Sequence, residues 1–332
     1  MNSKKRIAIL GDGSWGTTLA ILFSGKGHEV SLWGVFPDYI QSLKRSRENT
    51  KFLPQFEIPE AVNITDDVKE ATLGADIVVV ATPSQFTRKV LSGFKALDFS
   101  NCAIVSVVKG VENKTLKRIS EIIKEELNSN KICTLSGPTI ALEIARGAPA
   151  SAVVASEDSK LVAEVQNAFI TDRFRIYTSS DIIGVELGGS LKNIIAIAAG
   201  ISDGLGFGTN AKAALFTRGL VEIKRLGVAM GAKEETFNGL SGIGDLMTTC
   251  TSPYSRNRHV GEEVAKGKEL TEIIQQTEQI AEGVYTTESA YELAKKHNVE
   301  MPITEQVYKV LFENKNPLEA VIELMTRQKK EE

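Results

Sequence analysis

The sequence predicts a doubly wound α/β domain with a mostly parallel sheet, followed by an all-helical domain. Short apolar runs alternate with helix-length segments over about the first 180 residues, and from Asp181 onward only helical patterns remain. At 332 residues the chain is long enough for roughly two domains of about 150 residues each. We place the boundary near residue 180, giving domains 1–180 and 181–332, although no Gly/Ser or Pro linker marks it.

Several strand candidates of the first domain are continuous runs of Val, Ile and Ala. Such runs suit central strands of a parallel sheet covered on both faces. The candidates are Arg6–Leu10, Glu29–Trp33, Asp76–Ala81, Cys102–Val108, Lys131–Leu135, Ser151–Ala155 and Arg173–Tyr177. Between them, Lys114–Leu127 has apolar residues at helical spacing and is expected to form an amphipathic helix.

The second domain is expected to surround one buried helix. Leu191–Ile201 is apolar nearly all round, which is typical of a central helix. The other expected helices have mixed faces: Ala211–Leu226, Leu270–Ile280, Thr286–His297 and Thr304–Phe312.

Composition excludes several classes of function. Lys and Arg number 39 against 42 Asp and Glu, a net charge of −3 with no basic excess for general nucleic-acid binding. The three cysteines lie far apart and the three histidines show no ligand spacing, so neither a disulfide framework nor a zinc site is expected, and no metal. No apolar run reaches about 18 residues, so we expect a cytoplasmic protein with no membrane span.

A glycine-rich motif stands at the first expected strand-to-helix turn. Gly11-Asp12-Gly13-Ser14-Trp15-Gly16 follows one strand candidate, opens a helical stretch and precedes the second strand candidate on schedule. This context distinguishes a dinucleotide-binding loop of the Rossmann type from an ordinary glycine-rich turn. The glycines permit a tight turn and a close approach of the backbone to a pyrophosphate at a helix N-terminus.

The residues after the second strand leave the choice of cofactor open. An NAD site usually has an acid there to hold the ribose 2′-hydroxyl. The segment Trp33-Gly34-Val35-Phe36 has neither an acid nor an Arg or Lys for an NADP 2′-phosphate. If only the backbone and Trp33 contact this position, we expect kcat/KM for the two cofactors to differ by less than about tenfold, ~1.4 kcal/mol.

Two later turns of the first domain also have candidate site residues. Lys109 follows a strand candidate, where a desolvated ammonium needs an anionic partner unless the side chain emerges into solvent. Ser136-Gly137-Pro138-Thr139 resembles a helix start with proline in the first turn, whose amides would hold an anion.

Polar residues interrupt the apolar pattern of the second domain. Lys192 lies in a stretch that looks buried, where desolvation would lower its pKa and allow proton exchange near neutrality; the alternative is a surface lysine. Asp245, in a glycine-rich segment, is a candidate to orient it. Arg256 and Asn257 are candidates to hold a phosphate, whereas Arg258 fits a solvated loop. Ile280–Gly283 follows a helix and is also explained as its glycine cap.

Taken together, these motifs resemble the bacterial-type NAD(P)-dependent glycerol-3-phosphate dehydrogenases nearly from end to end. The lysine-centred GSLKNIIAIAAG is specific to that family, whereas many families share the glycine loop. The matching motifs, in chain order, are GDGSWGTTLA, VVKGVE, SGPTIALEIA, GVELGGSLKNIIAIAAGISDG, NAKAAL, GLSGIGDLMTTC, SRNR and EGVYT.

The resemblance implies an activity, a fold and a set of site residues. The reaction is the reduction of dihydroxyacetone phosphate to sn-glycerol 3-phosphate with NADP or NAD, feeding glycerophospholipid synthesis. The fold is that of the 6-phosphogluconate-dehydrogenase-like enzymes, and a homodimer is expected. The resemblance gives Lys192 as proton donor and acceptor, with Asp245 as its catalytic partner. The implied substrate contacts are Lys109, Gly137, Thr139, Lys192, Asp245, Ser255, Arg256 and Asn257. The expected cofactor contacts, from the glycine loop and the resemblance together, are Gly11, Gly13, Ser14, Trp15, Gly16, Trp33, Lys109, Ala141, Arg256, Ile280 and Glu282.

Gly34 departs from the family, which often has a basic residue just after the Trp33 position, so a strong NADP preference is not implied. Two other functions remain open at this point. One is a dehydrogenase of the same two-domain plan that acts on a β-hydroxyacid or a phosphosugar. The other is a sensor that binds NAD(H) and reports it to DNA or a partner, against which stand the absence of a recognisable DNA-binding module and of a basic excess.

Overall fold

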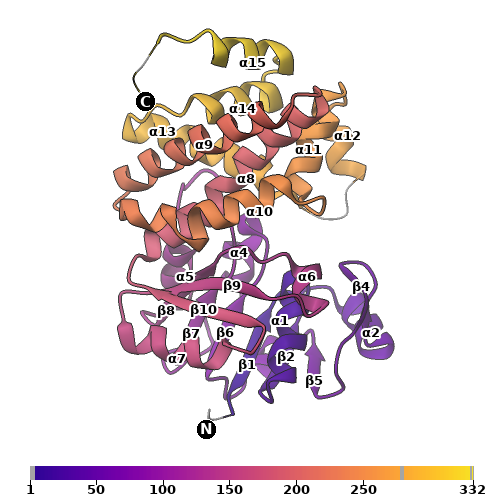
Figure 1. Cartoon of the computed structure of the whole chain (residues 1–332). Coiled ribbons are helices and arrows are strands. Elements are labelled where there is room, and N and C mark those ends of the chain that lie inside the picture. The colour runs from indigo at the N-terminus through magenta and orange to yellow at the C-terminus, as the bar shows by residue number, and fades with distance from the viewer. Residues whose placement is uncertain (1–3, 277–279, 330, 332) are drawn as a thin grey trace. The chain divides into compact units, whose positions relative to one another are not determined.

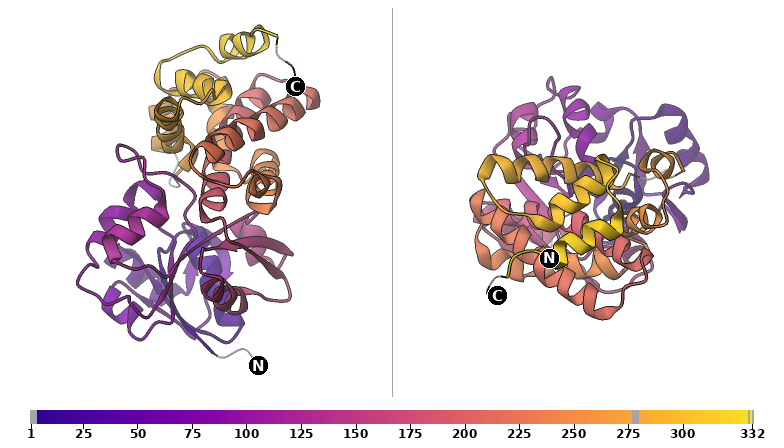
Figure 2. Two further views of the ribbon diagram at one scale, coloured as in Figure 1. Left: turned by 90° about the vertical axis from the view of Figure 1, so that its left-hand side faces the viewer. Right: turned by 90° about the horizontal axis from the view of Figure 1, so that it is seen from above.

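The computed structural model describes residues 4–276, 280–329 and 331, which fold into two compact units (Figures 1 and 2). The sheet unit comprises residues 4–108 and 118–186. The helical unit comprises residues 109–117 and the described part of 187–332. The short segment 109–117 thus belongs to the helical unit although the sheet unit precedes and follows it in the sequence. The predicted boundary near residue 180 stays a prediction.

The sheet unit is built on an eight-stranded sheet in the order β10-β9-β8-β7-β6-β1-β2-β5. All neighbouring strands are parallel except β8 and β9, which confirms the mostly parallel sheet. Seven strands lie at the predicted segments: β1 Arg6–Leu10, β2 Glu29–Trp33, β6 Ile77–Val80, β7 Ala103–Ser106, β8 Ile132–Ser136, β9 Ala150–Ala155 and β10 Phe174–Ser179. The edge strand β5 (Val62–Thr65) and the antiparallel pair β3 (Glu48–Asn49) and β4 (Leu53–Glu57) were not predicted.

Alternate residues of the central strands enter two different hydrophobic clusters. Ile7 packs in one cluster and Ala8 in the other, and Val79 and Val80 divide in the same way. Since successive side chains of a strand point to opposite faces, both faces of the sheet are covered. One face packs against α1 (Ser14–Gly25), α2 (Pro37–Ser46), α6 (Ala141–Ala145) and α7 (Ser159–Phe169). The other packs against α3 (Val68–Thr72), α4 (Ser84–Ser92) and α5 (Ile119–Leu127).

The amphipathic helix predicted for Lys114–Leu127 is wrong over its first five residues. Lys114 and Leu116 have φ angles of 68° and 60°, in the left-handed region, so no helix forms there. The helix begins at Ile119, where the Glu121 carboxylate accepts a hydrogen bond of 2.9 Å from the backbone N–H of Arg118. This carboxylate satisfies an N–H group that the first helical turn leaves free.

The helical unit is arranged around α8 (Ile182–Gly204), whose first five residues belong to the sheet unit. The predicted burial of Leu191–Ile201 is confirmed, since Leu191, Ile194 and Ile197 are fully buried. The helix is long and apolar enough to cross a membrane, but 89% of its most apolar window is buried in the protein, as in a core helix. No strand occurs among the residues described after Asp181. The other helices are α9 Thr209–Ala229, α10 Asp245–Thr251, α11 Arg256–Ala265, α12 Leu270–Gln276, α13 Glu282–His297, α14 Pro302–Phe312 and α15 Pro317–Met325.

Glycines let the backbone of α11 approach α8 closely. A Cβ atom at Gly200 would lie 1.9 Å from the carbonyl oxygen of Arg258, and one at Gly261 would lie 2.0 Å from that of Ile197. Any side chain at either position would push the two helices apart. This contact fixes the start of α11 against the central helix.

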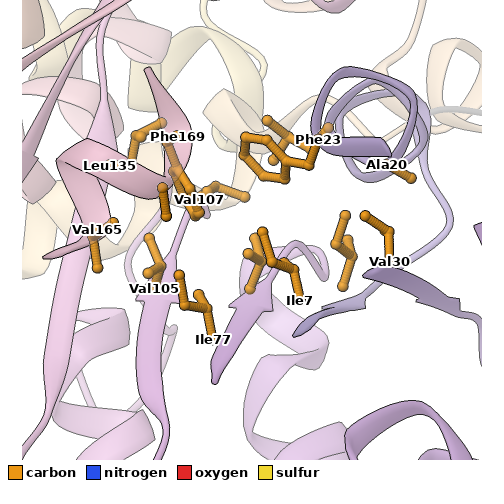
Figure 3. Packing of buried hydrophobic residues seen from close by; sticks show 14 of the residues in the cluster. Ile7, Ala20, Phe23, Val30, Ile77, Val105, Val107, Leu135, Val165 and Phe169 are labelled. Atoms are coloured by element: carbon orange, nitrogen blue, oxygen red, sulfur yellow. The ribbon is translucent and has the colours of Figure 1, made fainter. Parts of the chain in front are cut away.

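The Phe23–Phe169 pair gives a test of the sheet unit's core. Both rings are fully buried with centroids 4.3 Å apart, and Figure 3 shows them among the strand residues of this cluster. We expect Phe23→Ala to lower the free energy of unfolding by about 3–5 kcal/mol, because it removes apolar contacts and leaves a cavity. Urea denaturation followed by circular dichroism measures the loss. The matched control is Phe36→Ala, since Phe36 is 67% exposed; an equal loss in the two variants would contradict the assignment.

Candidate active site

The loop between β1 and α1 is shaped for a phosphate group. Gly11 has φ +129°, and a Cβ there would lie 2.6 Å from the carbonyl oxygen of Ala81, so only glycine fits. A Cβ at Gly16 would lie 1.9 Å from the carbonyl oxygen of Gly11, whereas one at Gly13 would meet nothing within 4 Å. No side chain caps α1 and no acid lies in its first turn, so its N–H groups are free to bind an anion. The loop therefore fits the pyrophosphate of a dinucleotide.

The two tryptophans predicted as cofactor contacts have different surroundings. Trp33 is 6% exposed, its indole N–H donates to the carbonyl oxygen of Asp66 at 2.9 Å, and its ring packs edge-on against Phe94. Trp15 is half-buried against Phe174. The Trp33 side chain thus belongs to the core, and its role toward a nucleotide stays a prediction.

The turn after β8 lies near the start of α1, but it is not the helix start expected from its sequence. The helix α6 begins at Ala141 with Ile140 as its cap, so Pro138 precedes it instead of lying in its first turn. Gly137 has φ +145° and packs on the backbone of Ala152, which is why the chain turns before the helix can start. The Thr139 hydroxyl donates to the carbonyl oxygen of Gly137 at 3.0 Å. Ala141 is brought to the glycine-loop helix, since its carbonyl oxygen accepts from the Thr18 hydroxyl at 3.3 Å.

In the helical unit, one carboxylate pairs with two lysines. The ammonium of Lys192 donates to Asp245 Oδ1, and Lys109 Nζ lies 2.7 Å from Asp245 Oδ2. Lys192 and Asp245 are buried, and Lys109 is half-buried. The predicted anionic partner of Lys109 is therefore found, and Asp245 lies in position to orient Lys192. Lys192 also contacts the Thr249 hydroxyl at 2.5 Å.

Burial gives Lys192 a pKa near neutrality. Desolvation lowers the pKa of Lys192 from 10.5 to about 7, against the opposing effect of the Asp245 charge and with a smaller lowering by Lys109. An amine with this pKa is present in both its protonated and neutral forms near pH 7. It can therefore give and take a proton under physiological conditions.

The turn before α10 determines where Asp245 lies in this cluster. A π-helical turn, Leu240–Gly244, leads into α10, whose first residue is Asp245. A Cβ at Gly188 would lie 2.5 Å from the carbonyl oxygen of Ser241, so this glycine lets α8 and the turn touch. Thr249 follows one helical turn after Asp245 on the same face. Thr249 was not predicted as a site residue, although its i+4 spacing from Asp245 was a usable signal in the sequence.

Two asparagines connect the lysine cluster to the starts of α11 and α13. Asn257 Nδ2 donates to Asn193 Oδ1 at 2.9 Å, and Asn257 Oδ1 accepts from the N–H of Gly283 at 2.9 Å. Asn193 Nδ2 in turn donates to the carbonyl oxygen of Lys109 at 3.3 Å. Asn193 thus links the segment of Lys109 to the start of α11, and it was not predicted as a site residue.

The remaining predicted residues of the helical unit lie at helix N-termini. Ser255 caps α11, its hydroxyl accepting from the N–H of Arg258 at 3.3 Å. The exposed Arg256 donates to the carbonyl oxygen of Ile280 at 3.0 Å. Glu282 begins α13, so the alternative of a glycine cap at the end of the preceding helix is wrong, although residues 277–279 lie outside the described part of the chain.

The structure thus divides the predicted site residues between the units. The sheet unit contains Gly11, Gly13, Ser14, Trp15, Gly16, Trp33, Gly137, Thr139 and Ala141. The helical unit contains Lys109, Lys192, Asp245, Ser255, Arg256, Asn257, Ile280 and Glu282. Each set is gathered within its own unit, where the first suits a nucleotide phosphate and the second suits proton transfer beside an anion site.

Comparison with known proteins adds a family relationship. Residues 6–162 match the family described as NAD-dependent glycerol-3-phosphate dehydrogenase N-terminus, and residues 181–322 match the corresponding C-terminus. The chain is 50% identical over 327 residues to a glycerol-3-phosphate dehydrogenase (NAD(P)+) of Thermoanaerobacter sp. (strain X514), covering 98% of each. It is also 50% identical to the enzyme of that name from Citrifermentans bemidjiense, with 99% of each covered.

Solved structures of glycerol-3-phosphate dehydrogenases are similar to this chain over nearly its whole length. The crystal structure of glycerol-3-phosphate dehydrogenase from Coxiella burnetii has a TM-score of 0.94 at 40% identity, over 98% of this chain and 99% of that one. The yeast (Saccharomyces cerevisiae) enzyme has a TM-score of 0.82 at 27% identity, over 98% of this chain and 100% of that one.

The charges around Lys192 predict the direction in which its pKa moves. Asp245→Asn removes a charge that raises the pKa, so Lys192 should titrate below about 7; Lys109→Gln removes a charge that lowers it, so Lys192 should titrate above about 7. NMR of isotopically labelled lysine side chains measures both, with Lys192→Gln identifying the resonance. A wild-type protein in which every lysine titrates above about pH 9 would contradict the assignment. The folded-state pKa lies below the unfolded one, so this group raises the free energy of unfolding as pH increases from about 7 to 10.5.

Proposed function

Because the chain belongs to the NAD-dependent glycerol-3-phosphate dehydrogenase family, we propose that Lys192 moves the proton in its reaction. The activity is the NAD(P)-dependent interconversion of dihydroxyacetone phosphate and glycerol 3-phosphate. One observation supports the role of Lys192 above the others: it is buried against Asp245 and has a pKa of about 7. A lysine whose pKa is strongly lowered by burial and that has a specific charged partner is a candidate for a functional role.

When bound, a nicotinamide dinucleotide would supply the hydride that C2 of the substrate receives. Negative charge then grows on the C2 oxygen, where the Lys192 ammonium stabilises it and delivers a proton from Nζ. Hydride and proton together convert the carbonyl into the hydroxyl group of glycerol 3-phosphate. In the reverse direction, neutral Lys192 takes the proton from that hydroxyl. Asp245 and Thr249 hold Nζ in place through the contacts described above.

The start of α11 is proposed to hold the substrate's phosphate. Ser255, Arg256 and Asn257 occupy its cap and first turn, and no acid lies in that turn. Helix N–H groups and a guanidinium are matched to phosphate oxygens. Binding energy from this remote group holds the carbonyl for reaction.

The glycine loop of the sheet unit is proposed to bind the dinucleotide's pyrophosphate. Its open backbone at Gly13 and the uncapped start of α1 support this assignment. Supply of glycerophospholipid synthesis, a cytoplasmic location and a homodimer are proposed from the family resemblance.

Lys192→Ala should abolish most turnover without preventing cofactor binding. Loss of general acid–base catalysis is expected to lower kcat by about 10²–10⁴-fold. The measurement is NADH and NADPH oxidation with dihydroxyacetone phosphate, together with a dinucleotide Kd from fluorescence. In the wild type, kcat/KM for reduction should fall as pH rises above about 7, because Lys192 loses the proton it must deliver.

The matched control is Lys224→Ala, a lysine of α9 that pairs with Glu234. It should leave kcat within about twofold. Full turnover in Lys192→Ala would refute the proton role. A variant that still responds to NADH in an interaction with DNA or a partner would instead favour the sensor.

Arg256→Ala tests the phosphate site. We expect KM for dihydroxyacetone phosphate to rise roughly tenfold or more, because a charge-assisted contact to the phosphate is lost. Activity with unphosphorylated dihydroxyacetone should change little, since this ligand has no phosphate to lose. An equal loss with both ligands would assign Arg256 a role other than phosphate binding.

A further inference from the structure

The side chain of Asp12 occupies the place from which a cofactor-selecting residue would extend. Asp12 lies between the two glycines that open the glycine loop, and Gly34 immediately follows β2. A Cβ atom built on Gly34 would lie 2.5 Å from Cδ1 of Ile40 and 2.7 Å from both Cγ and Oδ2 of Asp12. The Asp12 carboxylate and the apolar end of Ile40 therefore together fill the position at which a side chain on residue 34 would begin, and Asp12 contributes the polar group there.

Hydrogen bonds hold the backbone of the loop at Asp12 in place. The carbonyl oxygen of Asp12 accepts from Asn49 Nδ2 at 2.7 Å and from the Thr17 hydroxyl at 3.2 Å. Asn49 is fully buried and also donates to that hydroxyl at 2.7 Å. These bonds fix the backbone of residue 12, and its side chain then has little room beside Gly34.

The carboxylate is poorly compensated where it lies. Its Oδ2 atom is buried and has no hydrogen-bond partner within the described part of the chain. Burial raises the pKa of Asp12, and a backbone hydrogen bond and then the charge of the exposed Lys51 oppose this rise to a smaller extent. An additional negative group brought to this place would lie beside a carboxylate oxygen that no hydrogen-bond donor of the described residues contacts.

In a Rossmann-type site, the end of the second strand is where the adenosine ribose is distinguished. An acid there suits the 2′-hydroxyl of NAD, and a basic residue suits the 2′-phosphate of NADP. Gly34 supplies neither, but the Asp12 carboxylate lies within the space of its missing side chain. We propose that Asp12 supplies the negative charge that residue 34 lacks, so that the protein selects NAD(H) over NADP(H).

This assignment rests on the nucleotide-binding site proposed above and predicts which of the two dinucleotides that site prefers. The 2′-phosphate has close to two negative charges near neutral pH, and like charges at short range oppose binding. The 2′-hydroxyl of NADH is neutral and does not meet this repulsion. If only the backbone and Trp33 contacted the ribose 2′-position, the affinities for NADH and NADPH would differ by less than about tenfold. The charge of Asp12 should make this difference larger.

The test compares the Kd values of NADH and NADPH by fluorescence titration for the wild type, Asp12→Asn and Asp12→Ala. We expect the wild type to bind NADH more than about tenfold more tightly than NADPH, and both variants to reduce this ratio at least about tenfold. Tighter NADPH binding should account for most of that change, because the repulsive charge is lost while the NADH contacts remain. Asp12→Asn keeps the shape of the side chain, and Asp12→Ala guards against a new amide contact.

The matched control is Asp172→Asn, which removes one negative charge from an exposed turn of the same unit. It should leave the Kd ratio within about twofold, since water and salt screen an exposed charge. A ratio in both Asp12 variants within twofold of the wild type would overturn the role of Asp12 and leave the nucleotide site intact. A wild type that binds neither dinucleotide would overturn the proposed nucleotide site itself, and this inference with it.

Discussion

The helical unit depends on one buried carboxylate that pairs with two ammonium groups. Burying the charges of Asp245 and Lys192 is costly, and it is tolerated only when each has a close partner. Asp245 meets Lys192 with one oxygen and Lys109 with the other. The surplus positive charge and the lost hydration keep the Lys192 proton weakly held, so the same arrangement is both structural and chemical.

Close backbone contacts make this arrangement possible. Gly188 lets the turn before α10 approach α8, and Gly200 and Gly261 do the same for α8 and α11. Each contact leaves no room for a methyl group, so the three helices have one packing distance available. Lys192, Asp245 and the start of α11 therefore keep fixed positions relative to one another within the helical unit.

The sequence predicted best those features that depend on burial. The central strands among the seven were predicted because they are apolar on both faces. The short edge strand β5, in contrast, pairs only with β2 and has polar Asn63 exposed. The predicted start of α5 was wrong, because a helical spacing of apolar residues does not reveal the left-handed φ angles at Lys114 and Leu116.

Among the site residues, too, those whose role depends on burial were predictable from the sequence. The need of Lys109 for an anion was predictable from desolvation, and Lys192 was selected by its apolar neighbours. The direction of the Asp12 side chain was not predictable, because it depends on how the loop meets Gly34, some twenty residues later in the chain. Asn193 was missed for a similar reason, since its partners Asn257 and Lys109 come from distant segments.

The path of the chain between the two units determines which residues of the lysine cluster a fragment or a chimera would retain. Residues 109–117 belong to the helical unit, yet the sheet unit continues from 118 to 186. A fragment that starts at residue 187 would lack Lys109, so Asp245 would retain one of its two lysines. A chimera joined at that point would take Lys109 from one parent and Lys192 with Asp245 from the other. Recombination between relatives at this junction would therefore mix the charges of the cluster, and parents that differ around Lys109 would give offspring with an altered proton affinity at Lys192.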